Sequence, residues 1–242
     1  MGRYVQGSGS RGVAMKLVYV IMTTYNREKS AKATLKGLVD HLKYPNLKWI
    51  IADDGSGWDY QLSLRDYLSS HTDDEIHITN ANRKGVGCSK NLALRKAFAE
   101  TPYVFLLEDD WVLDSDLDLV PHVKAMEENT DVGMIRFGYL STGLSMEYVG
   151  RSGVGYLKLI RNSFPYVYSG QVSLRKKSWY DAHGFHKEGV SPGEEELDFC
   201  FRFNAGDPSW PDIFWPANIP VFWGPFKHMD FGISLNHINP EG

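Results

Sequence analysis

The first half of the chain alternates short apolar runs with segments of helical periodicity, and this alternation limits the possible folds more than any other feature. Apolar runs rich in β-branched residues predict strands, and apolar residues three and four positions apart predict helices. A chain that alternates the two forms an α/β fold with a doubly wound, mostly parallel sheet. The predicted strands are 17–22, 47–52, 75–79 and 103–107, and the predicted helices are 30–42, 60–68 and 89–100.

Polar side chains follow each of these predicted strands, in segments 23–27, 53–54, 80–88 and 108–110. In open parallel sheets, ligands bind outside the carboxyl ends of the strands. Loops without a shared role have no reason to place their acids and amides on the same rim. The sequence therefore predicts one cleft at this edge of the sheet.

The acidic triplet Glu108-Asp109-Asp110 is the strongest chemical signal in that cleft. Adjacent carboxylates at the end of a buried strand repel one another more strongly as solvent is excluded. A hard divalent cation, Mg²⁺ or Mn²⁺, relieves this repulsion and keeps further positions for substrate phosphates. The other interpretation of the triplet alone is a solvated acidic turn that also caps segment 114–118.

The second half is less regular, with a predicted strand at 132–137 and short β-like runs at 156–160 and 171–174. One helix start is clear, because Ser191 as N-cap, Pro192 at the first helical position and Glu194 predict a capping box. Asp198 and Arg202 are expected to form an i, i+4 ion pair on its polar side. The residues expected to bury this helix are Leu197, Phe199, Cys200, Phe201 and Phe203.

Glutamates at 194, 195 and 196 open that helix, and the last two are candidates for a general base. Glu196 precedes Phe199 and Cys200 by three and four residues, so we expect its carboxylate to lean towards the buried side. An apolar environment raises the pKa of a carboxylate, as a base working near neutrality requires. We predict Glu196 as the base. Glu195 also stays open, because the extra glutamate at position 194 leaves the position of the base ambiguous by one residue. The alternative is a purely structural first turn, in which the acids stabilise the helix dipole.

Composition excludes several classes of protein. With 242 residues, a net charge of −4 and no cluster of Lys and Arg, the chain lacks the electrostatic pattern of a dedicated nucleic-acid binder, which makes a nucleic-acid acceptor the less favoured one. No apolar run approaches the roughly 20 residues that span a bilayer, so we expect a cytoplasmic protein, with peripheral membrane attachment left open. The Gly/Ser-rich residues 1–14 are expected to be a flexible leader or tag remnant.

Taken in order, these motifs resemble the nucleotide-sugar-dependent glycosyltransferases of the GT-A fold, most closely the inverting family 2. The resemblance covers most of the chain from Met15. Segments 23–27, 53–56 and 84–91 are similar to that family's first-strand loop, its base-binding acidic turn and the loop and helix start beside the donor. The triplet is similar to the DXD metal motif, with Glu in the first place.

On the acceptor side, 170–175 resembles a family segment, and 195–202 resembles the Glu-Asp motif that supplies the base, with Glu196 where the family usually has Asp. The resemblance implies one GT-A domain over 15–242, with a Rossmann-like donor-binding half at 15–115 and an acceptor and catalytic half at 116–242. It also implies a nucleoside-diphosphate sugar as donor, with a UDP-sugar favoured, and a saccharide or another hydroxyl-bearing acceptor.

The resemblance assigns the remaining roles by position. Mn²⁺ or Mg²⁺ would be held by Glu108, Asp110 and His228. The residues expected at the donor are Thr23, Tyr25, Asn26, Arg27, Asp53, Asp54, Gly85, Lys90, Asn91 and Asp109. Gly170 and Gln171 are expected at the acceptor by the same resemblance. Trp111 and Trp179 are also expected there, because each adjoins one of these motifs and large aromatic rings stack on sugar faces.

Three alternatives remain open: a retaining glycosyltransferase, which would be indifferent to the loss of Glu196, a nucleotidyltransferase, and a non-catalytic binding module. A nucleotidyltransferase would use the same metal and a similar sheet, but it needs a Gly-rich basic loop after the first strand, and segment 23–27 has no glycine. A non-catalytic nucleotide- or glycan-binding module would keep Asp53 and Asp110 but would have no use for Glu196.

Overall fold

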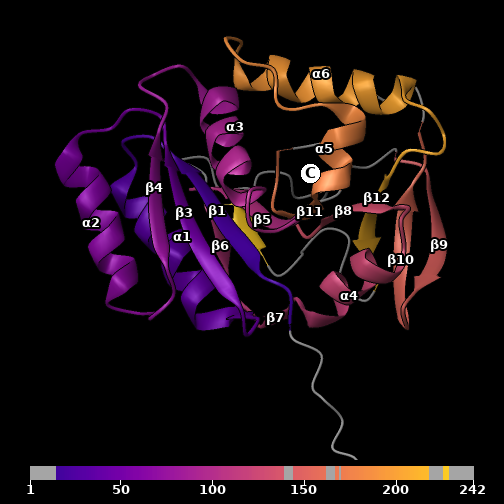
Figure 1. The fold of residues 1–242 in the computed structure, drawn as a ribbon, viewed down its shortest axis with the longest axis horizontal. Helices are drawn as coiled ribbons and strands as arrows, with labels where there is room; N and C mark the ends of the chain where they lie inside the picture. The colour runs from indigo at the N-terminus through magenta and orange to yellow at the C-terminus, as the bar shows by residue number, and fades with distance from the viewer. Residues whose placement is uncertain (1–14, 139–143, 162–166, 169, 218–225, 229–242) are drawn as a thin grey trace, which may run out of the picture.

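A nine-stranded mixed sheet runs through the middle of the molecule (Figure 1). The computed structural model describes residues 15–138, 144–161, 167–168 and 170–217, and the backbone of 226–228. The strands of the sheet are β1 (Val18–Thr24), β3 (Leu47–Asp53), β4 (Ile76–Asn80), β5 (Tyr103–Glu108), β8 (Val132–Arg136), β9 (Met146–Arg151), β10 (Val154–Leu159), β11 (Ser173–Lys176) and β12 (Asp212–Pro216). Their order is β4-β3-β1-β5-β11-β8-β12-β10-β9.

Two pairs of short strands lie outside this sheet. They are β2 (Leu42–Lys43) with β7 (Leu117–Asp118), and β6 (Trp111–Leu113) with β13 (Phe226–His228). The second pair directly follows the acidic triplet, and it brings a segment from near the end of the chain to the end of β5.

Helices cover both faces of the large sheet, because alternate residues of each central strand are apolar on both sides. Val18, Val20 and Met22 of β1 pack in a cluster with α1 (Glu28–His41), α2 (Trp58–Ser69) and α4 (Val120–Glu128). Tyr19 and Ile21 pack in a second cluster with α3 (Val86–Ala97), α5 (Lys177–His183) and α6 (Pro192–Ala205). Such two-sided burial is the signature of a parallel α/β sheet.

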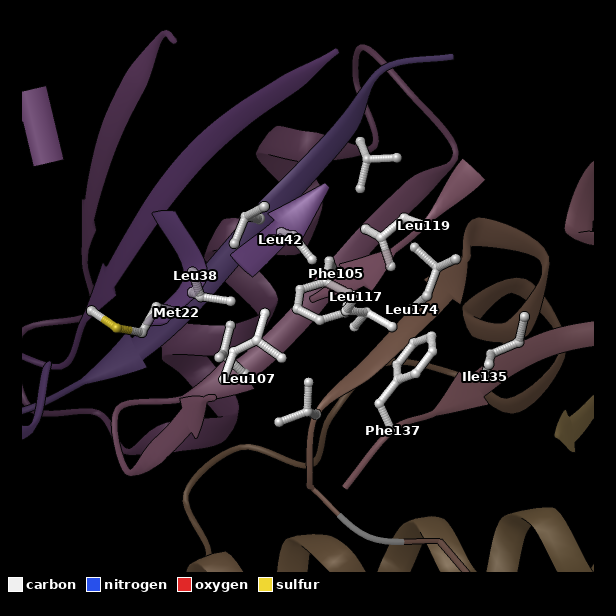
Figure 2. Close-up of a cluster of buried hydrophobic side chains, with 14 of the residues drawn as sticks. Met22, Leu38, Leu42, Phe105, Leu107, Leu117, Leu119, Ile135, Phe137 and Leu174 are labelled. Carbon is white, nitrogen blue, oxygen red and sulfur yellow. The ribbon is translucent and has the colours of Figure 1, made fainter. Parts of the chain in front are cut away.

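The first cluster joins the two halves of the chain. Figure 2 shows Phe105 and Leu107 of β5 near Leu38 of α1, with Leu174 of β11 and Phe137 beyond them. Each of these side chains is almost completely buried. The strands of the first half and those of the second half therefore share one core.

The predicted α/β fold is confirmed. All four strands and all three helices predicted in the first half are present, and β4, β3, β1 and β5 pair in parallel. The antiparallel pairs, β5 with β11, β11 with β8, β12 with β10 and β10 with β9, all involve strands of the second half.

The sequence analysis missed strand β9. Ser152 and Gly153 join it to β10 in a two-residue turn, and both have positive φ, at 51° and 83°. Positive φ at both central residues is the conformation of a tight hairpin turn. The Ser-Gly pair between two β-like runs was the signal for this hairpin.

Within the described residues, none of the helices has both the length and the apolar character needed to cross a membrane.

We expect Phe105→Ala to lower the free energy of unfolding by about 3–5 kcal/mol, because it empties a fully buried site in the central strand β5. Phe201→Ala is the matched control, since 64% of Phe201 is exposed and its loss should cost less than about 1 kcal/mol. Urea unfolding of both variants measures the difference. Equal losses at the two positions would contradict the described core.

Candidate active site

The chain reverses its direction of travel across the sheet between β1 and β5. Strand β1 pairs with β3 on one side and with β5 on the other, which makes the β1–β5 boundary a topological switch point. In open α/β sheets, the crevice outside the strand ends at such a point is where ligands bind. The loop after β1 and the acidic triplet after β5 both lie there.

The two loops are in direct contact. The Thr24 hydroxyl donates to Asp109 Oδ2 at 2.7 Å. Arg27 Nη1 lies 3.3 Å from Asp109 Oδ1 and 3.2 Å from Asp110 Oδ2. The expectation that the polar segments after these two strands meet in one place is therefore confirmed. Thr23 lies one residue further inside β1, and its hydroxyl donates to the Leu107 carbonyl at 3.4 Å.

The acidic turn after β3 divides its two aspartates between two tasks. Asp53 is fully buried and accepts hydrogen bonds from the Gly55 and Ser56 amides at 2.8 and 2.7 Å and from Gln61 Nε2 at 3.0 Å. Asp54 is only partly buried, and its Oδ1 accepts from the Gly85 amide at 2.9 Å. Burial raises the pKa of Asp54. Asp53 therefore shapes the turn, and Asp54 is the carboxylate nearer to solvent.

Tyr25 and Arg83 form an exposed edge beside this turn. Arg83 Nε donates to the Tyr25 hydroxyl at 2.9 Å, and its guanidinium carbon lies 5.6 Å from the ring centroid. Asn26 and Arg83 both have positive φ, at 51° and 61°. Non-glycine residues in this region are held there by their surroundings and gather at functional sites. Here the Asn26 amide donates to Ser56 Oγ, and the Arg83 amide donates to the Asp54 carbonyl.

The acidic triplet is not a solvated turn. Asp109 and Asp110 are buried, and burial raises the pKa of Asp109 to about 6. Two basic side chains neutralise part of the charge, because Arg27 contacts both aspartates and Lys90 Nζ lies 3.0 Å from Glu108 Oε1. Arg27 and Lys90 thus supply part of the positive charge that the triplet was expected to need.

The backbone brings the predicted third metal ligand to the same place. Within the described part of the chain, no three side chains of His, Cys, Asp or Glu form a metal-binding group. The pairing of β13 with β6 places His228 opposite Trp111, the residue after Asp110. The His228 side chain itself lies outside the described atoms. Carboxylate oxygens suit Mg²⁺ and Mn²⁺, so Glu108 and Asp110 fit a divalent cation.

Lys90 lies at the centre of a buried cluster of charges. Its ammonium, 1% exposed, is 3.0 Å from Glu108 Oε1 and 3.3 Å from Glu195 Oε2. The His186 Nδ1 contacts the other oxygen of Glu195. Burial alone would raise the pKa of Glu195, but Lys90 and His186 outweigh it and lower that pKa. Glu195 is therefore a buried, ionised counter-ion.

Glu196 has a different environment from Glu195. It is partly exposed, its Oε1 accepts from the Gly170 amide, and burial raises its pKa, in the direction predicted from the sequence. The sequence analysis was wrong about which glutamate is more buried. Glu195 precedes Phe199 by a full turn, and it is Glu195 that shares the buried side of α6 with Phe199.

The rest of α6 follows the prediction with two exceptions, Phe201 and Leu197. The capping box of Ser191 and Glu194 and the ion pair of Arg202 with Asp198, at 2.6 Å, are both present. Phe201 was expected to be buried and is not, because the buried stripe consists of Phe199, Cys200 and Phe203, and position 201 points away from it. Leu197 is only partly buried.

Several residues predicted at the donor or the acceptor are engaged in contacts within the protein. Trp179 is fully buried, with its ring 5.6 Å from that of Phe203, so it lines no cleft and is not part of the proposed acceptor site. Trp111 is also buried. Gln171 accepts from Arg136 Nη2 at 3.2 Å, and Asn91 bonds to the His186 backbone at both ends of its amide.

Three basic residues near the glutamates escaped the sequence analysis. His186 contacts Glu195, Arg175 donates to the Tyr168 and Tyr180 hydroxyls at 3.0 and 2.8 Å, and Arg136 donates to the Val167 carbonyl at 3.0 Å. For the two arginines there was a signal, because Arg136 stands within the predicted strand 132–137 and Arg175 directly follows the β-like run 171–174. A charge buried there requires partners. For His186 there was no signal, because the local sequence does not indicate that its ring contacts Glu195 at the start of α6.

We expect Glu195→Gln to lower the free energy of unfolding at pH 7 by about 3–5 kcal/mol, since it breaks a buried ion pair. The pKa of Glu195 is lower in the folded than in the unfolded chain. Its stabilisation is therefore present above the unfolded value of about 4.3 and is lost as the pH falls. Denaturant unfolding between pH 3 and 7 should show the gap between wild type and variant narrowing in acid. The exposed Glu194→Gln on the same helix should show a much smaller gap, because glutamine also completes a capping box. A constant gap for Glu195→Gln would refute the assignment.

Comparisons with known proteins agree with this architecture. The chain is similar to the mannosyltransferase PcManGT from Pyrobaculum calidifontis in complex with GDP-Man and Mn²⁺, with 16% identity, a TM-score of 0.54, and coverage of 84% of this chain and 57% of that one. For S. aureus TarS 1–349 in complex with UDP-GlcNAc, the values are 16%, 0.57, 83% and 58%. For GalNAc-T7 with UDP, GalNAc and Mn²⁺, they are 11%, 0.54, 90% and 44%.

These identities establish the fold alone, which is the predicted GT-A glycosyltransferase fold, and the chain spans only about half the length of those proteins. No curated protein matches the chain in sequence. The family model described as Glycosyl transferase family 2 matches residues 19–186, which is most of the chain and includes the loops of the switch point. The chain therefore belongs to glycosyl transferase family 2.

Proposed function

We propose that the chain moves a sugar from a nucleoside-diphosphate sugar to an acceptor hydroxyl, with inversion at the anomeric carbon and with the help of a divalent metal. One observation supports this most strongly. Glu108 of the acidic triplet and Glu196, a partly buried glutamate of raised pKa, come from opposite halves of the chain and converge on Gly170. A Cβ atom on Gly170 would lie 2.8 Å from Glu196 Oε1 and 3.2 Å from Glu108 Oε1.

Glu196 is the proposed general base. Its carboxylate takes the proton from the acceptor hydroxyl, and the acceptor oxygen forms a bond to the anomeric carbon. The bond between that carbon and the phosphate oxygen breaks, and its electron pair leaves with the nucleoside diphosphate. The Gly170 amide holds one carboxylate oxygen of Glu196, which orients the group for this transfer. Glu195 is unsuited to the role, because it is buried and already paired with Lys90 and His186.

The donor is proposed to lie along the switch point. Tyr25 with Arg83 forms a face for the nucleobase, and Asp54 offers an acceptor to its edge or to a ribose hydroxyl. UDP is favoured, and the presence of UDP-GlcNAc or GDP-Man in similar structures supports a nucleotide-sugar donor. Donor contacts belong to 15–115, and the acceptor side to 116–242.

The metal is proposed to be Mn²⁺ or Mg²⁺, held by Asp110, Glu108 and His228. When bound, it would neutralise charge on the diphosphate of the leaving group. Arg27 contacts Asp110 from a half-exposed position, so a stronger cation can displace it from that oxygen at little cost. The acceptor is proposed to be a saccharide or another hydroxyl-bearing molecule that reaches Glu196 past Gly170.

We expect Glu196→Gln to reduce turnover by roughly 10²- to 10⁴-fold at nearly unchanged donor affinity, the usual scale for loss of a general base. Because burial raises the pKa of Glu196, wild-type kcat should fall in acid with an apparent pKa above the ordinary value of a glutamate. Steady-state release of nucleoside diphosphate between pH 4 and 8 measures both effects. The capping residue supplies the control, Glu194→Gln, which should keep wild-type turnover. Retention of turnover by Glu196→Gln, with loss in Glu195→Gln, would move the base by one residue.

We also expect one of UDP, dTDP, GDP and CDP to raise the melting temperature in the presence of Mn²⁺. A ligand at 100 times its Kd adds about 2.7 kcal/mol, which corresponds to roughly 5–11 °C for a domain of this size. Asp110→Ala should abolish the shift, whereas Asp114→Ala, an exposed position four residues later, should keep it. A shift that survives Asp110→Ala, or that needs no metal, would contradict the proposed metal site.

A further inference from the structure

Lys90 was expected among the residues at the donor, but its surroundings assign it another role. Its side chain is 1% exposed, and its ammonium forms ion pairs with two carboxylates, Glu108 at 3.0 Å and Glu195 at 3.3 Å. We propose that Lys90 is a positioning residue, which fixes the donor-side acid Glu108 relative to the base-bearing helix α6. This inference rests on the proposed function.

The three members of this contact come from three different elements. Lys90 belongs to α3, Glu108 ends β5, and Glu195 lies in the first turn of α6. Helices α3 and α6 pack on the same face of the sheet, and the start of α6 lies next to α3 (Figure 1). A single buried cation therefore sets the distance between the end of β5 and the start of α6.

Further hydrogen bonds hold Glu195, the buried partner of Lys90, in place. His186 Nδ1 contacts Glu195, and its Nε2 lies 3.2 Å from the Tyr180 hydroxyl, which in turn accepts from Arg175. Burial lowers the pKa of His186 to about 4, so the ring is neutral and donates its one proton to the carboxylate. The His186 amide donates to Asn91 Oδ1 at 3.0 Å, and Asn91 is the neighbour of Lys90.

In front of the ammonium lies the space that Gly170 keeps open. A Cβ atom at this position would be 2.8 Å from Glu196 Oε1, 3.2 Å from Glu108 Oε1 and 3.4 Å from Lys90 Nζ. The proposed base and the donor-side acid thus converge on one point, with the ammonium beside them. Without the lysine charge, Glu108, Glu195 and Glu196 would repel one another in a site of low polarity.

Stability and positioning can be separated with a double variant. Lys90→Met alone leaves Glu195 buried without its main counter-ion, so it should lower the melting temperature. Adding Glu195→Gln removes that charge, and Glu108 is one-third exposed, so water can solvate it. Lys96→Met, a lysine on the same helix that contacts none of these carboxylates in the described structure, is the matched control.

The assay measures melting temperature and steady-state nucleoside diphosphate release from UDP-GlcNAc, UDP-glucose and GDP-mannose with Mn²⁺. The expected result is that Lys90→Met/Glu195→Gln recovers most of the melting temperature lost by Lys90→Met, but stays about 100-fold below wild type in kcat. Such a loss is typical of a displacement of about 1 Å in a catalytic group. Donor KM should remain within about threefold of wild type, because the ammonium contacts protein carboxylates and not the donor.

Recovery of kcat together with stability would show that Lys90 only supports the fold, and would overturn the inference. A large rise in donor KM at unchanged kcat would return Lys90 to the donor site, and would overturn it equally. If the wild type releases no nucleoside diphosphate from any of the three donors, the proposed function fails, and this inference fails with it.

Discussion

The parallel pairing of β1 with both β3 and β5 is the constraint on which the rest of the structure depends. It places the carboxyl ends of these three strands at one edge of the sheet. The loops that follow β1 and β5 then leave the sheet at neighbouring positions. The loop after β1 and the acidic triplet after β5 are thereby brought into contact, through Thr24 and Arg27. The proposed donor site rests on this convergence of charged groups from two separate loops.

Buried charge determines how the second half attaches to that rim. Lys90, Glu195 and His186 are almost inaccessible to water, and removing ions from water is costly unless each is paired and hydrogen-bonded. These pairs form only when α3, the end of β5 and the start of α6 are packed together, so that Lys90 reaches both Glu108 and Glu195. Glu196, one residue along the same helix, then stands at the edge of this cluster of charges with a raised pKa. The ionised Glu195 is held by Lys90 and His186, and its neighbour Glu196 is the proposed base.

Much of the fold followed from local pattern, because strands such as β1 and β5 and helices such as α3 are determined by periodicity. The capping box at Ser191 was equally local. The burial of Glu195 rather than Glu196 was not, because it depends on which side of α6 meets Lys90, more than 100 residues away. Trp179 illustrates the same limit, since composition cannot distinguish a core tryptophan from one that lines a ligand site. His186 became visible only after folding placed it beside Glu195.

The most direct test of the central claim is a crystal structure with UDP and Mn²⁺, in which anomalous scattering locates the metal. The account predicts the diphosphate outside the ends of β1 and β5, with Mn²⁺ bound to Asp110 and the nucleobase against Tyr25. Glu196 should face the side of the site opposite the leaving phosphate. A nucleotide bound elsewhere on the molecule, or a metal that does not contact Asp110, would contradict the proposed donor site.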